Sequence, residues 1–197
     1  MRTSILFLFG LSLLAANELH AQRAAGEEPR SVELSLSDEA GEVRYRAPTS
    51  IGGQPNTEVT YAVFMSEDRD LVGSAALLFG TDLDFGPIEL RLGPQAYVGL
   101  LDEENEDMFA LAIGVAVRFD IIPSRGIAIV GSANWSPDIL TFGSADNLTD
   151  MMARAEIRLS DRVIGFAGYR WFRLDLTMRE RNTLQNELFA GINWRLQ

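Results

Sequence analysis

The stretch Asp107–Asp120, DMFALAIGVAVRFD, decides the fold that this sequence predicts. Large apolar residues stand at every second position from Phe109 to Phe119, and alanine, glycine and arginine fill the positions between them. Side chains of a β-strand point to opposite faces in turn, so the pattern predicts a strand with one large apolar face. The stretch exceeds the ~5–6 residues of a typical soluble strand and reaches the ~9–11 that a tilted strand needs to cross a bilayer.

The same alternation recurs along the rest of the chain, most clearly in Ile88–Leu100 and Leu188–Leu196. Turn residues separate the alternating segments, as they separate the strands of a meander. The sequence therefore predicts an all-β protein, an antiparallel up-and-down transmembrane β-barrel with eight strands. The eight predicted strands are 57–66, 71–80, 88–101, 107–120, 126–136, 151–159, 163–176 and 185–196.

Two regions leave the arrangement open. SVELSLS (31–37) and EVRYRA (42–47) look like short strands, and as a hairpin they would raise the strand number to ten. Residues 148–159 also carry apolar residues at helical spacing. A strand over 151–159 is favoured there because the tight link 160–162 leads directly into another apolar run, as in a hairpin.

The N-terminus has the pattern of an export signal. Arg2 is followed by an apolar run from Ile5 to Ala16, and a small residue, Ala21, stands at a suitable cleavage position. The apolar run is too short for a membrane-spanning helix, which needs about 20 residues. The expected organisation is a signal peptide (1–21), an N-terminal lead-in with one or two short strands (22–56) and the barrel (57–197).

The connections between the strands suggest an orientation. With the C-terminus on the periplasmic side, long and short connections mostly alternate, as in barrels whose longer loops are external. The predicted external loops are 102–106, 137–150 and 177–184, and the predicted periplasmic ones are 81–87, 122–125 and 160–162. The acidic segment Asp102–Asp107 could hold a divalent cation, but it lacks the spacing of an EF-hand and fits a solvated loop better.

Charged residues are expected on the inner face of the barrel. An eight-stranded barrel is just wide enough for its side chains, so these charges would neutralise one another rather than line a channel. With a higher strand number, a charged pore would be the alternative. Placing the apolar residues of 163–176 toward lipid also points Arg170 outward, which suggests a position near the rim or a bulge around Gly168. The expected inner set is Glu89, Arg91, Arg118, Arg154, Glu156, Arg158, Arg173, Asp175, Glu187 and Arg195, and the lipid-facing set in 163–176 is Ile164, Phe166, Phe172, Leu174 and Leu176.

Composition excludes several function classes. The chain has no cysteine, and its one histidine, His20, lies in the predicted signal peptide. Catalysis by Ser-His-Asp or Cys-His groups and the usual imidazole or thiolate metal sites are therefore not expected. We predict no catalytic, cofactor-binding or metal-binding residues and no enzyme activity. A net charge of −11 without a basic patch also argues against nucleic-acid binding.

With the strands and the tail considered together, the chain resembles the YfaZ family of Gram-negative outer-membrane proteins. The resemblance implies a porin-like barrel without an assigned enzymatic activity, and it supplies no functional residues. The segments that carry it are SLSDEAGEVRY (35–45), TYAVFMSEDRD (60–70), GYRWFRLDL (168–176) and ELFAGINWRLQ (187–197).

These observations predict a structural or porin-like barrel of the cell outer membrane. Its expected partners are outer-membrane lipids, lipopolysaccharide and, during insertion, the barrel assembly machinery, and its oligomeric state stays open. The alternative is a soluble exported barrel that binds a small apolar ligand, and it would turn its apolar faces inward. A third hypothesis, a lipid-modifying barrel enzyme, has little support in a mature chain without histidine.

Overall fold

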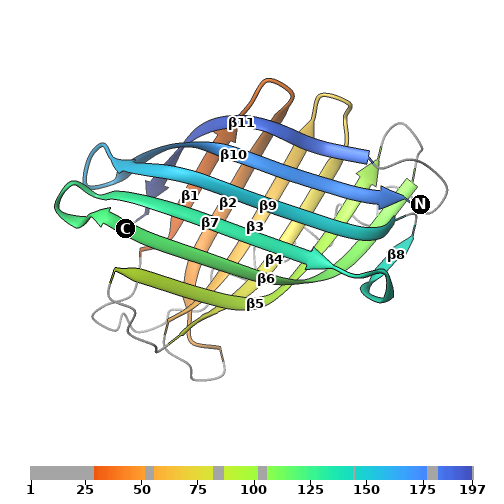
Figure 1. Ribbon diagram of the computed structural model, residues 1–197, viewed down its shortest axis with the longest axis horizontal. Coiled ribbons are helices and arrows are strands. Elements are labelled where there is room, and N and C mark those ends of the chain that lie inside the picture. The colour runs from red at the N-terminus through yellow and green to blue at the C-terminus, as the bar shows by residue number, and fades with distance from the viewer. Residues whose placement is uncertain are drawn as a thin grey trace.

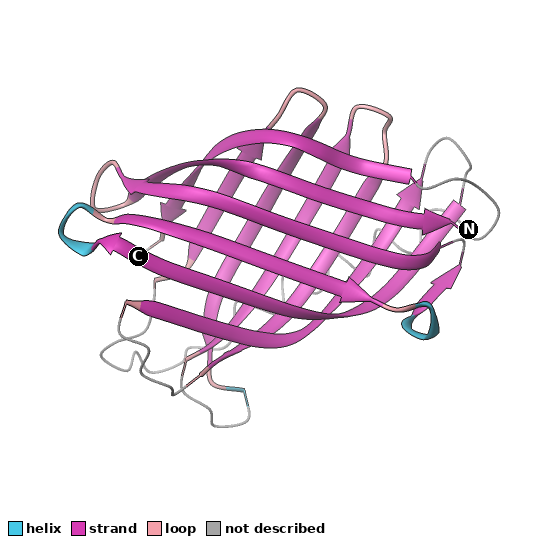
Figure 2. Cartoon of the chain, in the orientation of Figure 1, coloured by secondary structure: helices cyan, strands magenta, loops and turns pink. Residues whose placement is uncertain are grey.

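The structure is a computed structural model that describes residues 29–51, 56–81, 87–101, 106–143, 145–176 and 182–196. The predicted signal peptide (1–21) lies outside the described residues. Long strands dominate the described part of the chain (Figure 2). They are β1 (Ser31–Leu36), β2 (Ala40–Thr49), β3 (Thr57–Ser66), β4 (Leu71–Gly80), β5 (Ile88–Leu101), β6 (Glu106–Ile122), β7 (Ile127–Ser136), β8 (Thr141–Gly143), β9 (Ala145–Arg158), β10 (Val163–Leu176) and β11 (Asn182–Arg195), with short 3₁₀ turns η2 (Pro123–Arg125) and η3 (Asp138–Leu140).

Ten of these strands close into one antiparallel barrel (Figure 1). The order around the wall is β5-β4-β3-β2-β1-β11-β10-β9-β7-β6, and the pairing of β5 with β6 closes the ring. The prediction of eight strands is wrong, and the proposed hairpin at 31–47 supplies the other two. Strand β1 pairs along its whole length with β11, from Ser31 beside Arg195 to Leu36 beside Ala190. The hairpin is thus part of the wall.

The two ends of the barrel are defined by the chain. We call the end at which β1 begins and β11 finishes, at Ser31 and Arg195, the terminal end. We call the opposite end, which carries the β1–β2 turn at 37–39, the far end.

The segment 137–150 is not the long loop that the sequence predicted. Strand β9 already begins at Ala145, and it is a strand rather than the alternative helix. The short β8 pairs with Met108–Ala110 of β6, whose far-end part extends beyond the residues that β7 covers, Ile113–Ile122. Unpaired edge groups are costly, and β8 covers this edge. The predicted contrast between long and short connections is therefore weaker than expected.

The outer wall is apolar. In β6, Ile113 is 67% exposed whereas its neighbour Ala112 is 3% exposed. Strands β5 and β11 follow the same rule, as Leu92 and Leu188 point outward while Tyr97 and Phe189 point inward. The predicted faces of these three strands are confirmed.

The prediction for 163–176 is wrong about the two faces of β10, because the face expected toward lipid lies inside the barrel. Phe172 and Leu174 are fully buried inside the barrel, and Arg170 lies on the same inner face at 6% exposure. Arg170 therefore needs neither a rim position nor a bulge at Gly168, and the register shift between β10 and β11 falls between Phe172 and Arg173. The expected lipid-facing residues Ile164 and Phe166 are also buried inside, while Arg173 and Asp175, expected inside, share the outward face with Tyr169.

Gly168 has a different role from the one predicted. It lies on the inner face of β10, and a Cβ atom there would collide with the backbone oxygen of Ala153 and with the side chain of Arg154. Glycine thus allows β10 and β9 to approach where the Arg154 side chain turns into the interior.

Candidate functional site

The interior of the barrel is the candidate site, and its most constrained side chain is Arg170. The Nη1 atom of Arg170 donates to Glu42 of β2 at 2.6 Å, and Nε and Nη2 donate to the two carboxylate oxygens of Asp150 of β9 at 2.8 and 3.0 Å. The hydroxyl of Tyr97 in β5 donates to Asp150 at 3.1 Å. The guanidinium carbon also lies 4.8 Å from the ring centre of Phe172. We call Arg170, Asp150, Glu42 and Tyr97 the Arg170 cluster, which joins four strands across the interior.

A second ion-pair cluster lies nearer the terminal end, around Arg154. Its Nη1 donates to Glu33 of β1 at 2.5 Å, and its Nη2 donates to Glu156 at 2.6 Å. Arg118 of β6 donates to the other oxygen of Glu156 at 2.6 Å. The Arg154 guanidinium stands 4.3 Å from the ring centre of Phe166, which adds a cation–π contact. Buried charges require such partners, because an unpaired one costs several kcal/mol.

Apolar side chains fill the interior at the far end. Phe64 and Phe172 meet edge to face, with ring centres 5.5 Å apart, and Tyr97 packs on Phe172 at 6.0 Å. This far-end core of large buried side chains consists of Phe64, Val72, Tyr97, Leu101, Met108, Leu148, Phe172, Leu174 and Leu184. A part of the interior that the sequence led us to expect as small and charged is therefore a packed hydrophobic core.

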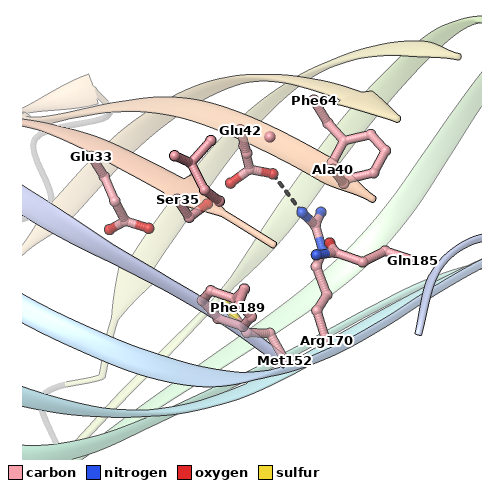
Figure 3. Close-up of a pocket in the computed structure, with 11 residues that line it drawn as sticks. Glu33, Ser35, Ala40, Glu42, Phe64, Met152, Arg170, Gln185 and Phe189 are labelled. Atoms are coloured by element: carbon pink, nitrogen blue, oxygen red, sulfur yellow. Dashed lines mark hydrogen bonds and ion pairs between the residues drawn. The ribbon is translucent and has the colours of Figure 1, made fainter. Parts of the chain in front are cut away.

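Little room remains beside the Arg170 cluster. Figure 3 shows the space between Glu42, Arg170 and Phe189, with the Glu42–Arg170 ion pair reaching across it. Its volume is about 10 Å³. A space of that size holds about one water molecule. The space beside the Arg170 cluster is thus too small for a hydrated solute.

A larger cavity lies beside the ion pairs of Arg154, with Arg118 and Glu156 in its lining. Its volume is about 120 Å³. Arg44 and Arg46 of β2 line one side, and Arg91 of β5 and Arg118 of β6 line another. We call it the terminal-end cavity.

The structure confirms part of the predicted inner set and adds to it. Glu89 and Arg91 line the terminal-end cavity with Arg118 and Glu156, and Arg154 is buried beside them. Glu187 and Arg195 are half-buried and share the inner face of β11 with the buried Phe189 and Asn193. Arg158 is exposed at the end of β9. Sequence reasoning missed Glu33, Glu42, Arg44, Arg46 and Asp150, although the polar alternation of SVELSLS and EVRYRA contained a signal for the first four.

Residues 102–105 of the acidic segment that the sequence offered as a possible cation site lie outside the described residues. Among the residues that the structure describes, no three His, Cys, Asp or Glu side chains are grouped so that they could hold a metal ion. Within the same part of the chain, no helix is long and apolar enough to cross a membrane.

A closed antiparallel barrel with an apolar outer wall and ion-paired charges inside has the architecture of the transmembrane β-barrel class. The family assignment agrees with this architecture. The chain belongs to the YfaZ family, since the family model described as YfaZ precursor matches residues 31–196. The match spans the whole described barrel, including the β1–β2 hairpin.

Two solved structures are similar in fold. A bacterial polysaccharide outer membrane secretin aligns at a TM-score of 0.47 with 14% identity, covering 85% of this chain and 70% of that one. The outer membrane channel DcaP of Acinetobacter baumannii aligns at a TM-score of 0.43 with 10% identity, covering 89% of this chain and 55% of that one. A comparison with curated proteins found no match.

Proposed function

We propose that this protein is an outer-membrane β-barrel that its own side chains close at the far end, so that its role is structural or ligand-binding rather than that of an open diffusion channel. The observation that carries the proposal is the space of about 10 Å³ beside the Arg170 cluster. Hydrated solutes do not pass a space that holds about one water molecule.

The direction of the side chains supports the membrane part of the proposal. Ile113, Leu188 and Trp194 are 67%, 74% and 53% exposed, and they lie on the outer face of β6 and β11. Large exposed apolar surfaces of this kind suit a hydrocarbon environment. The alternative, a soluble barrel with an apolar ligand inside, is not favoured because such a protein would present polar side chains outward.

The proposed setting includes partners and an orientation. We place the terminal end on the periplasmic side and the far end outside, with lipopolysaccharide around the far-end rim and the barrel assembly machinery acting during insertion. We also expect no catalytic activity, since the sequence after Ala21 contains neither histidine nor cysteine. Hydrolysis of a lipase substrate by the purified protein would contradict that expectation.

Planar-bilayer recording tests the closure. The folded protein, identified by its heat-modifiable migration on a gel, should show no stable single-channel steps after insertion. The double variant Arg170→Ala/Phe172→Ala removes two of the largest side chains that fill the interior at this level and should produce measurable steps. The matched control Arg173→Ala changes an outward residue of the same strand and should stay silent. Stable openings of the wild-type protein would contradict the proposal, as would location only in the soluble periplasm.

A further inference from the structure

The terminal-end cavity differs from the rest of the interior in being reached by solvent. The side chains of Arg46 and Arg91 are each 22% exposed and that of Arg118 is 26% exposed, whereas Arg154 next to the cavity is completely buried. Glu58 and Glu89 lie one residue inside the terminal-end limits of β3 and β5. The cavity therefore opens toward the terminal end, and its lining continues inward as far as Ser74 of β4 and Asn134 of β7.

The arginines around the cavity converge from separate parts of the wall. Arg44 and Arg46 come from β2, while Arg91 and Arg118 come from β5 and β6, and β3 and β4 stand between the two groups. Four guanidinium groups thus face one space of about 120 Å³. Liquid water takes about 30 Å³ per molecule, so the cavity has room for roughly four waters or for one small ion of a few heavy atoms.

Two acidic partners of the β2 arginines, Glu42 and Glu33, lie behind them. Glu42 accepts hydrogen bonds from Arg44, and its side chain is 6% exposed; Glu33 lies 3.3 Å from Arg46, and its side chain is 3% exposed. Neither carboxylate lines the cavity. The surface that β2 presents to the cavity is therefore cationic, although each guanidinium has a counter-charge on its other side.

The carboxylates that do line the cavity are occupied. Glu58 accepts from Arg91 at 2.7 Å and from the hydroxyl of Thr60 at 3.1 Å, and Glu156 accepts from Arg118 at 2.6 Å. The third, Glu89, lies 3.7 Å from Arg91 at the exposed rim of the cavity. Arg46 is held less tightly, with its contacts to Glu33 and Glu58 at 3.3 and 4.0 Å. A guanidinium group carries five N–H donors in a planar fork, which suits bidentate binding of an oxyanion.

Neutral donors complete the lining. Ser74 and Ser132 contribute hydroxyl groups, and Gln95 and Asn134 contribute amides. Hydroxyls and amides donate to ligand oxygens without adding charge. The cavity thus combines positive charge, hydrogen-bond donors and a volume suited to a small ligand.

From these observations we propose that the terminal-end cavity is a binding site for a small oxyanion, a phosphate or short carboxylate, with Arg46 as its principal contact. The site goes beyond the proposed barrel function and does not depend on whether the barrel conducts. If the terminal end is periplasmic, the ligand is a periplasmic solute.

Calorimetric titration of the folded, detergent-solubilised full-length protein with inorganic phosphate tests the site, with acetate and chloride titrated in parallel. We expect saturable binding of one phosphate or acetate per chain and at least tenfold weaker binding of chloride. Arg46→Gln should weaken oxyanion binding by about tenfold or more, because it removes a charge-assisted contact. The matched control Arg173→Gln, on the outward face, should leave it unchanged.

A second variant separates the site from a general charge effect. Ser132→Leu keeps every arginine but places a larger side chain in the cavity, and it should also abolish binding. Heat-modifiable migration verifies that each variant is folded. Absence of saturable binding, binding that survives both Arg46→Gln and Ser132→Leu, or equal affinity for chloride would each overturn the proposal. Because no membrane crossing is measured, these results are independent of the conductance experiment.

Discussion

The substitution Arg170→Ala tests whether the Arg170 cluster stabilises the barrel. It removes three hydrogen bonds, to Glu42 at 2.6 Å and to Asp150 at 2.8 and 3.0 Å, and leaves both carboxylates inside the protein. Breaking a buried ion pair by removing one partner costs about 3–5 kcal/mol when the remaining charge has no other cation. Asp150 is in that position, since it keeps only the Tyr97 hydroxyl, whereas Glu42 keeps Arg44. We therefore expect the free energy of unfolding to fall by about that amount.

Urea unfolding in lipid vesicles measures the change. All three tryptophans, Trp135, Trp171 and Trp194, belong to the outward faces of their strands, so their fluorescence reports the loss of the apolar environment on unfolding. Arg173→Ala is the matched control, since Arg173 lies on the same strand but points outward and pairs with Asp175 at 3.1 Å on a partly exposed surface. That pair should contribute only about 0–1 kcal/mol.

A rescue variant distinguishes buried charge from lost packing. Adding Asp150→Asn to Arg170→Ala removes the negative charge that the single substitution leaves without a cation, and Glu42 stays unchanged because it pairs with Arg44. The double variant should regain most of the lost stability, because neutral groups cost far less to bury than carboxylates. The reasoning is refuted if Arg170→Ala costs less than about 1 kcal/mol, or if the double variant is less stable than the single one.

Two further predictions use the same unfolding measurement. Ile113→Arg places a charge near the middle of the outer face of β6 and should cost about 2–4 kcal/mol in lipid. Ile139, in the turn η3, is 81% exposed, and Ile139→Arg should cost only about 0–1 kcal/mol. Equal costs would argue against a bilayer around the barrel. Tyr97→Phe removes the hydroxyl that donates to Asp150 at 3.1 Å and should cost about 1.5–3 kcal/mol, because the lost bond goes to a charged group; an unchanged or higher stability would contradict that contribution.

The sequence predicted the strands well where the two faces differ strongly. In β6 the outward residues are large and apolar and the inward ones are small, so one pattern gives both the strand and its faces. The same holds for β11, where Leu188 and Ile192 alternate with Phe189 and Asn193. In such strands the alternation within one segment predicts both the strand and its two faces, because the neighbouring strands need not be known.

Strand β10 was assigned the wrong faces because both of its faces carry aromatic residues. Phe166 and Phe172 point inward, while Tyr169 and Trp171 point outward. The assignment assumed an interior of small and charged residues, but the far-end core is apolar. Arg170 was the sequence signal against that assignment, since a charge costs less among buried partners than toward lipid.

The partners inside the barrel depend on closure and could not be read from spacing. Arg170 and Glu42 are 128 residues apart in sequence, and Arg154 and Glu33 are 121 residues apart. No local pattern links residues at such separations. Strand β1 has only six residues, and both β1 and β2 carry polar residues on their inner faces. Their strand signal is therefore weaker than that of the apolar strands, which explains the prediction of eight strands.

These long-range pairs account for the number of strands. The β1–β2 hairpin contributes Glu33 and Glu42, and both carboxylates bind arginines of β9 and β10. A ring closed without the hairpin, by pairing β3 directly with β11, would leave Arg154 and Arg170 buried without these carboxylates. Arg154 would keep Glu156 and Arg170 would keep Asp150, so each loss costs less than the ~3–5 kcal/mol of a buried charge without any partner. The two ion pairs therefore favour ten strands over an eight-stranded closure. The hairpin stabilises the fold through its two carboxylates as well as through its backbone hydrogen bonds.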